Sequence, residues 1–248
     1  MVLPRRQPRM RNADASVSHT GMLRATHYHA PAMTMPIANL HDHEAVAPRE
    51  LLQALAAAAA QLAQRGWTPA TSSNFSARVD AQRIAITVSG RDKATLGPDD
   101  FMLIGNDAQP LDARQPSAET RLHTQIYAHW PQVGAVLHTH SLTQTVASLH
   151  WAAAGEVQLE GYELIKAIHG HDSHQQSLRL PVFANSQHMP DIEAAVDAWL
   201  QRGLPLHAYL IAGHGLYAWG RSIAEAMRHI EALEFMLACA IELRKLPS

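Results

Sequence analysis

Residues 133–140 read VGAVLHTH, and this stretch decides both the fold and the chemistry of the chain. Its first half is a short apolar run of the kind that forms a buried β-strand. Successive side chains of a strand alternate between faces, so His138 and His140 point the same way, with Cα atoms about 6.5–7 Å apart. Two imidazoles at this separation can bind one ion at about 2.0–2.1 Å each. The stretch therefore predicts two protein ligands of a metal site.

A third candidate ligand is His214, which lies between two glycines in AGHGL at residues 212–216. It follows another apolar run, AYLIA at residues 208–212. The glycines allow the backbone to approach a metal closely. Three neutral imidazoles with one open position are typical of a catalytic zinc site, although iron binds the same set. With 17 histidines in the chain, a chance His-x-His is not rare, so the prediction depends on its context.

The composition favours one α/β domain with a tail. A chain of 248 residues, 47% of them hydrophobic and 17% charged, can bury one sizeable core. The formal net charge of −2 argues against a nucleic-acid partner. No apolar stretch approaches the roughly 18 residues that span a bilayer. The single cysteine, Cys239, excludes an intrachain disulfide framework, and we expect a cytoplasmic protein.

Residues 1–47 differ from the rest of the chain. They contain several arginines, few acidic residues and no apolar core of a secretory signal. The arginines loosely resemble an organelle transit peptide. A disordered extension, or a true start at Met33 or Met35, fits the composition better. We therefore expect an extension at 1–47 and a catalytic domain at 48–248.

The pattern of residues 48–248 predicts helices that surround a central set of short strands. Ser222 and Glu225 form a capping box at the start of the last helix. The arrangement indicates an α/β protein with the three layers of an α/β/α sandwich. The predicted helices cover residues 49–65, 117–129, 142–150, 163–168, 190–202 and 222–245, and the predicted strands cover residues 75–79, 83–88, 133–138, 180–184, 208–212 and 217–219.

Two polar loops and three carboxylates are further candidates for a site. The loops are TSSN at residues 71–74 and SGRDK at residues 89–93, whose hydroxyl and backbone N–H groups would suit a phosphate, although ordinary turns use the same residues. Glu119, Glu160 and Glu163 are the carboxylates. On a helix Glu160 and Glu163 would share a face, which a solvated surface also explains. A carboxylate beside a metal-polarised carbonyl could instead transfer protons.

Five motifs occur in a fixed order: SNFS at 73–76, SG at 89–90, PSAET at 116–120, HTH at 138–140 and GHG at 213–215. Together they resemble the class II aldolase family over residues 48–245. The resemblance implies a mostly antiparallel central sheet between helices and a homotetramer with sites near subunit contacts. It also implies one Zn²⁺ per subunit, held by His138, His140 and His214.

The segment LEGYELIKAI at residues 159–168 resembles the methylthioribulose-1-phosphate dehydratase branch of that family. This resemblance implies the zinc-dependent dehydration of 5-methylthioribulose 1-phosphate to 2,3-diketo-5-methylthiopentyl 1-phosphate, a step of methionine salvage. It implies that Glu163 is the acid/base, and that Glu119 either shares in catalysis or lines the substrate site. The phosphate would be held by Ser73, Asn74, Ser89, Gly90 and Ser117, with Lys93 or Lys166 supplying charge.

Three other interpretations remain open. A class II aldolase or epimerase acting on another phosphorylated ketose would share the metal chemistry. A non-catalytic interaction module, like the aldolase-like domain of adducins, would be expected to lack the metal ligands, which this chain retains. A metal site on His169, His171 and His174 has no apolar strand beneath it, so we expect those side chains to face solvent or surround the site.

Overall fold

The computed structural model describes residues 47–247, so all but the last residue of the predicted extension at 1–47 lies outside the described part. Eight strands form one sheet in this part of the chain. The strands are β1 (Asn74–Arg78), β2 (Arg83–Thr87), β3 (Phe101–Gly105), β4 (Ala135–Thr139), β5 (Glu156–Glu160), β6 (Ser177–Phe183), β7 (Ala208–Ile211) and β8 (Leu216–Gly220).

The order of the strands across the sheet is β3-β2-β1-β4-β8-β7-β6-β5. Only β6 and β7 run parallel, and every other neighbouring pair is antiparallel. The prediction of a mostly antiparallel sheet is therefore confirmed. Strands β1, β4 and β8 occupy the centre, and the metal-ligand candidates lie on or next to this central group.

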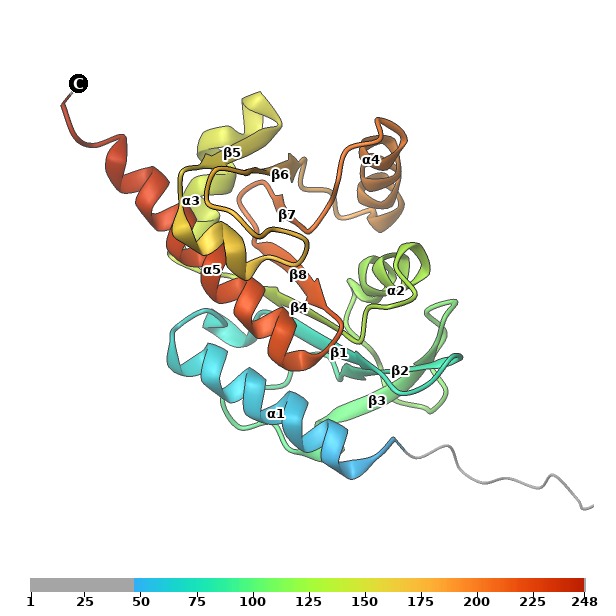
Figure 1. Ribbon diagram of the computed structural model, residues 1–248. Coiled ribbons are helices and arrows are strands. Elements are labelled where there is room, and N and C mark those ends of the chain that lie inside the picture. Colours follow the sequence, from blue (N-terminus) through green and yellow to red (C-terminus); the bar gives the residue numbers. More distant parts are fainter. Residues whose placement is uncertain (1–46, 248) are drawn as a thin grey trace, which may run out of the picture. The chain divides into compact units, whose positions relative to one another are not determined.

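Helices cover both faces of the sheet (Figure 1). On one face lie α1 (Arg49–Gln64), α3 (Leu142–Trp151) and α5 (Ile223–Leu243), which share one apolar core with the strands. On the other face lie α2 (Thr120–His129) and α4 (Met189–Gln201), which form a second core. These layers confirm the predicted three-layer sandwich.

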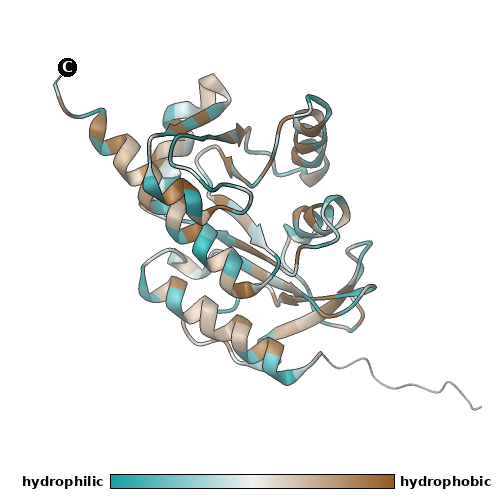
Figure 2. Cartoon of the chain, in the orientation of Figure 1, coloured by the Kyte–Doolittle hydropathy of each residue, from teal (hydrophilic) through white to brown (hydrophobic). Residues whose placement is uncertain are grey.

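The period of two along β4 assigns its side chains to the two cores. Ala135 and Leu137 belong to the core under α1, α3 and α5, whereas Val136 belongs to the core under α2 and α4. His138 continues the Val136 series, so its imidazole lies on the α2 face. Figure 2 shows apolar and hydrophilic residues interspersed along α2 and α4, as expected of helices with one buried face.

Most predicted elements are present within a few residues, but β3 and β5 were not predicted. In β5 only Val157 and Leu159 are buried, and the polar residues that alternate with them, Glu156, Gln158 and Glu160, are partly or fully exposed, so the strand carries little apolar signal. Glu160 ends β5, whereas Glu163 begins a 3₁₀ helix, Glu163–Ala167. The two glutamates therefore do not share a helical face. None of the helices within residues 47–247 is long and apolar enough to cross a membrane.

Candidate metal centre and active site

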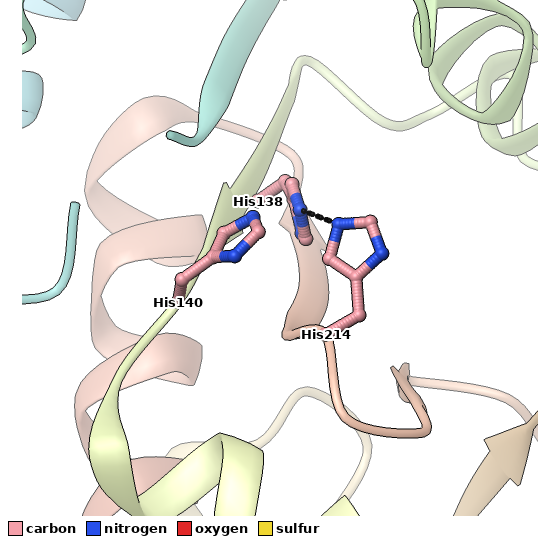
Figure 3. Close-up of side chains that lie close together, drawn as sticks. All are labelled: His138, His140 and His214. Atoms are coloured by element: carbon pink, nitrogen blue, oxygen red, sulfur yellow. Dashed lines mark hydrogen bonds between the residues drawn. The ribbon is translucent and has the colours of Figure 1, made fainter. Parts of the chain in front are cut away.

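His138, His140 and His214 converge at the end of β4 (Figure 3). Each offers one ring nitrogen within 4.8 Å of those of the other two, and no other such group of His, Cys, Asp or Glu occurs among residues 47–247. The Nε2 atoms of His138 and His214 lie 3.2 Å apart. Two ligands of one tetrahedral zinc ion, each at 2.0–2.1 Å, would lie about 3.3 Å apart. The spacing of this pair therefore fits a shared metal ion.

The protonation of these rings also fits a metal. His138 Nδ1 lies 3.0 Å from the carbonyl oxygen of Leu216 and donates to it, which leaves the Nε2 lone pair free for a metal. Burial lowers the pKa of His138 to about 4 and that of His140 to about 3. Both rings are thus neutral near pH 7, as metal ligands must be.

The two glycines beside His214 have separate roles. Gly213 adopts a φ of +66°, in the left-handed region that favours glycine. A Cβ atom on Gly215 would lie 2.1 Å from the carbonyl oxygen of Thr139. Only glycine allows this approach, so the GHG motif holds His214 against the end of β4.

Glu119 immediately precedes α2 and brings a carboxylate to the three histidines. Its Oε1 lies 3.0 Å from His214 Nε2, and its Oε2 lies 3.3 Å from His138 Nε2. Burial would raise the pKa of Glu119, but the hydrogen bonds that its carboxylate accepts, including the one from the Tyr217 hydroxyl, hold the pKa below its usual range. The carboxylate is therefore ionised beside the candidate metal site.

A pocket of about 220 Å³ adjoins this carboxylate. It brings together segments that are far apart in the sequence, and both polar loops predicted to bind phosphate contribute to it. Its lining includes Ser73, Asn74, Ser89, Gly90, Ser117, Glu119 and His140. The pocket therefore joins the predicted phosphate residues to the metal centre.

The Asn74 side chain has partners that were not expected from the sequence. Its Nδ2 donates to Glu119 Oε2 at 2.8 Å, and its Oδ1 faces the ring of His123. Both polar atoms of the amide are thus engaged within the protein. One N–H of the Asn74 amide is thus used by Glu119, and the second remains a candidate for a phosphate in the pocket that Asn74 lines together with Ser73, Ser89, Gly90 and Ser117.

The pocket also contains a buried lysine. Lys93 Nζ donates to the carbonyl oxygens of Thr71 at 2.9 Å and Arg91 at 2.5 Å. Burial lowers the pKa of Lys93, against the opposing effect of Asp92. Lys93 lines the pocket within its own chain, whereas Lys166 pairs with Glu163 and does not line it.

The loop before β1 has strained backbone at three residues other than glycine. Ala70, Thr71 and Ser73 have φ values of +52°, +59° and +76°. Each such conformation costs about 1–3 kcal/mol and is common at ligand-binding sites. In the same loop the buried Ser72 hydroxyl has no hydrogen-bond partner among the described residues. The strain and the free hydroxyl both fit a loop shaped for a ligand.

Glu163 lies away from this pocket within its own chain. Glu160, at the end of β5, pairs with Ser177 at the start of β6. The other end of β6, Phe183, pairs with β7 beside the turn that carries His214. The two ends of β6 are roughly 20 Å apart, since a strand rises about 3.3 Å per residue. Glu163 follows Glu160 by three residues, and its side chain is 68% exposed. Its carboxylate pairs with Lys166 and with His174, at 3.7 Å from His174 Nδ1. Neither Glu163 nor Lys166 is among the residues that line the pocket.

The histidines of the alternative cluster have separate partners. The backbone N–H of His169 donates to His229 Nε2 at 3.0 Å, and the His171 ring packs edge-on against His207. His174 faces Glu163. Within the described residues, the only group suited to a metal is the triad at the end of β4.

We expect a double variant, His171→Ala with His174→Ala, to retain the wild-type metal content of about one ion per chain. Metal analysis by inductively coupled plasma mass spectrometry after dialysis tests this. Loss of the metal in the double variant would show that the second cluster, and not the triad, holds the ion.

The sequence reasoning missed His123 and Tyr217 as site residues. His123 follows Glu119 by four residues, so the two share a helical face at the start of α2. Tyr217 stacks on His138 with ring centroids 4.0 Å apart and donates to Glu119 Oε2 at 2.6 Å. The spacing from Glu119 and the cross-strand pairing of Tyr217 with His138 are the signals that could have identified them.

Comparison with known proteins agrees with this geometry. Residues 53–241 match the family described as Class II Aldolase and Adducin N-terminal domain. The chain belongs to this family. A methylthioribulose-1-phosphate dehydratase of Xanthomonas campestris pv. campestris (strain 8004) is 53% identical over 218 residues, which cover 88% of this chain and 98% of the relative. A protein of the same name from Stenotrophomonas maltophilia (strain R551-3) is 54% identical over 198 residues, covering 79% and 92%.

Solved structures of the class II aldolase fold also resemble the chain. The L-fuculose-1-phosphate aldolase of Thermus thermophilus superposes with a TM-score of 0.64 at 23% identity, covering 79% of this chain and 97% of the aldolase. At this level of identity the likeness concerns the fold alone. It agrees with the three layers and the mostly antiparallel sheet described above.

Proposed function

We propose that this chain is a metal-dependent hydro-lyase that converts 5-methylthioribulose 1-phosphate to 2,3-diketo-5-methylthiopentyl 1-phosphate, a step of methionine salvage. Relatives named methylthioribulose-1-phosphate dehydratase, 53–54% identical over most of both chains, support this substrate. The observation that carries the proposal is the geometry of the pocket. A polar, lysine-containing pocket adjoins a carboxylate and three convergent histidines.

His138, His140 and His214 would hold Zn²⁺. When bound, this ion supplies a Lewis acid that polarises the ketose carbonyl at C2 and makes the neighbouring C3 proton more acidic. The protein keeps the rings of His138 and His140 neutral and orients the first of them through the carbonyl of Leu216. The donor set suits zinc, and iron is the alternative that metal analysis of the purified protein would distinguish.

The phosphate group of the substrate would lie in the pocket beside the metal centre. Ser73, Ser89 and Ser117 supply hydroxyls and Gly90 supplies backbone close to the ligand. Lys93 would add positive charge, since its ammonium group has a third N–H besides the two that donate to backbone carbonyls. A phosphate held there would place C2 and C3 of the sugar near Glu119.

The reaction needs a group that moves protons. Removal of the C3 proton leaves its electron pair to form an enediol, the C4 hydroxyl then leaves with a proton as water, and the enol that remains tautomerises to the diketone. Glu163 is our candidate for this acid and base. Glu119, ionised beside the histidines, is placed to accept a hydrogen bond from a substrate hydroxyl and to hold it in position.

Because Glu163 lies away from the pocket of its own chain, we propose that it acts on the pocket of a second copy. Its side chain is largely exposed, as this role requires. The homotetramer implied by the family resemblance would supply that copy. Each complete site would then contain the triad of one chain and Glu163 of its neighbour.

An exposed apolar stripe on α3 fits a contact between copies next to the metal centre. Leu142 is 82% exposed, Leu149 is 60% exposed, and Val146 lies between them on the same face of α3. The helix begins two residues after His140. Leu149 packs against Gly213, next to His214, since a Cβ atom built on Gly213 would lie 3.2 Å from the Leu149 side chain. A second copy that covers this stripe would approach the mouth of the metal site.

Product analysis tests the proposed function. Protein loaded with Zn²⁺ is incubated with 5-methylthioribulose 1-phosphate, and the products are separated by mass spectrometry. We expect a diketone that has lost one water, and a chelator should abolish its formation. A three-carbon phosphate together with an aldehyde would instead establish an aldolase. A protein that binds the metal but leaves the substrate unchanged would exclude the proposed reaction.

A further inference from the structure

A buried series of hydrogen-bonded side chains, the polar chain, leads from Glu119 into the core under α2. The Asn74 amide contacts both Glu119 and His123, and Ser76 Oγ lies 2.7 Å from His123 Nδ1. The chain ends at Tyr127, whose hydroxyl lies 3.0 Å from Ser76 Oγ. The four residues from Asn74 to Tyr127 are all buried. A buried polar group without a partner is costly, so such a chain is stable only if every donor meets an acceptor.

The direction of each hydrogen bond in this chain follows from Glu119. The Tyr217 hydroxyl and Asn74 Nδ2 both contact Glu119 Oε2, which accepts from both, so Asn74 turns its NH₂ group toward Glu119 and its carbonyl oxygen toward His123. His123 must then donate from Nε2. Burial lowers the pKa of His123 to about 4, so its ring is neutral and Nδ1 must accept from the Ser76 hydroxyl. Ser76 in turn accepts from Tyr127.

Tyr217 supplies a second donor to the same carboxylate oxygen. Its hydroxyl donates to Glu119 Oε2 at 2.6 Å, while the Asn74 amide donates at 2.8 Å. The Tyr217 ring is stacked on His138, with an angle of 14° between the planes. Its position is therefore fixed both by the candidate metal ligand and by the carboxylate.

We propose that His123 and Tyr217 are positioning residues for Glu119, the first acting through the Asn74 amide and the second directly. The chain from Tyr127 to Asn74 fixes which end of the amide faces the carboxylate. Two fixed donors then hold one oxygen of Glu119, so the carboxylate is in place before the substrate arrives. The effect of His123 and Tyr217 on turnover rests on the proposed function, whereas the direction of the hydrogen bonds between these side chains does not.

The direction of the hydrogen bonds made by His123 can be measured without an activity assay. In protein labelled with ¹⁵N-histidine, the two-bond ¹⁵N–¹H spectrum distinguishes the two neutral tautomers and the imidazolium, and the signals that disappear in His123→Gln identify His123. We expect a neutral ring with its proton on Nε2 at pH 7. A neutral ring with its proton on Nδ1 would turn the NH₂ group of Asn74 toward His123, away from Glu119, and would overturn the proposal.

Kinetics test the positioning role. Hydrogen bonds to a charged group are among the strong ones, so Tyr217→Phe and His123→Phe should each lower kcat about tenfold or more, with KM changed less than about threefold. His123→Gln should recover most of the loss, because the Gln amide can donate from the place of Nε2. In a Glu119→Gln background, Tyr217→Phe should cost less than about twofold, since the carboxylate is already absent.

Tyr209→Phe is the matched control. Tyr209 is buried and stacked on Tyr217, but its hydroxyl has no hydrogen-bond partner among the described residues. Its removal should leave kcat within about twofold of wild type. Folded Tyr217→Phe and His123→Phe proteins with wild-type kcat, or the same loss with and without the Glu119 carboxylate, would contradict the positioning role. If the wild type itself does not dehydrate the substrate, the proposed function fails. The tautomer of His123 would still show whether the hydrogen bonds between Tyr127 and Glu119 run in the proposed direction.

Discussion

Glu163→Gln is expected to lower kcat at least about 100-fold while the protein keeps its full metal content. The amide of Gln has nearly the shape of the carboxylate but cannot take up or release a proton near neutral pH, and general acid–base groups contribute about 10²–10⁴ in rate. Steady-state kinetics on 5-methylthioribulose 1-phosphate, with metal analysis of the same sample, measures both quantities.

Glu160→Gln is the matched control for this variant. Glu160 is also exposed and is three residues away, but it ends β5 and its side chain contacts Gln158. Its replacement should leave kcat within about twofold of wild type, as is usual for exposed residues away from special features. Near-normal turnover of Glu163→Gln at full metal content would exclude Glu163 as the acid and base.

His140→Ala is expected to abolish activity by removing the metal. The loss of a residue that only contacts a metal ligand lowers metal affinity by up to about 100-fold. The loss of a ligand itself should cost more, so the affinity of His140→Ala for the metal should fall more than about 100-fold. The fold should survive, because His140 follows the last residue of β4 and is not part of either apolar core. Metal content after dialysis and the circular dichroism spectrum measure the two effects separately.

The His171→Ala and His174→Ala double variant, which removes imidazoles from the other cluster, is the control for this prediction. A His140→Ala protein that retains one tightly bound ion per chain would show that the triad does not hold the metal. Retained metal with lost activity would indicate instead that His140 acts on the substrate.

The sequence predicted the elements that carry a strong local signal. Strand β4 was recognised because an apolar run ends in His-x-His, and α5 because Ser222 precedes a long amphipathic pattern. The structure confirms the cap through the bond from Glu225 N–H to Ser222 Oγ, but the Glu225 carboxylate accepts from the backbone N–H of Arg221, so the second bond of the predicted capping box is not formed. The strand β5 was missed because only two of its side chains are buried. The order of the strands depends on long-range pairing, to which local patterns give little access.

The metal triad could be predicted, since a period of two and a glycine-flanked turn are local features. The surroundings of Glu119 could not. Its partners Asn74 and Tyr217 come from β1 and β8, which are more than a hundred residues apart in the sequence but lie on either side of β4 in the sheet. The proposed role of Glu163 in the site of a second copy illustrates the same limit, because the sequence of one chain carries no local pattern for a contact between chains.

The measurement that tests the central claim most directly is complementation between two inactive variants. Glu163→Gln and His140→Ala chains, each with its own affinity tag, are produced together, and protein that carries both tags is purified. If every site combines the triad of one chain with Glu163 of another, random mixing leaves both parts intact at about one site in four, and about a quarter of the wild-type activity should return. Mixed protein with no more activity than either variant alone would show that the triad and Glu163 do not form one site between chains.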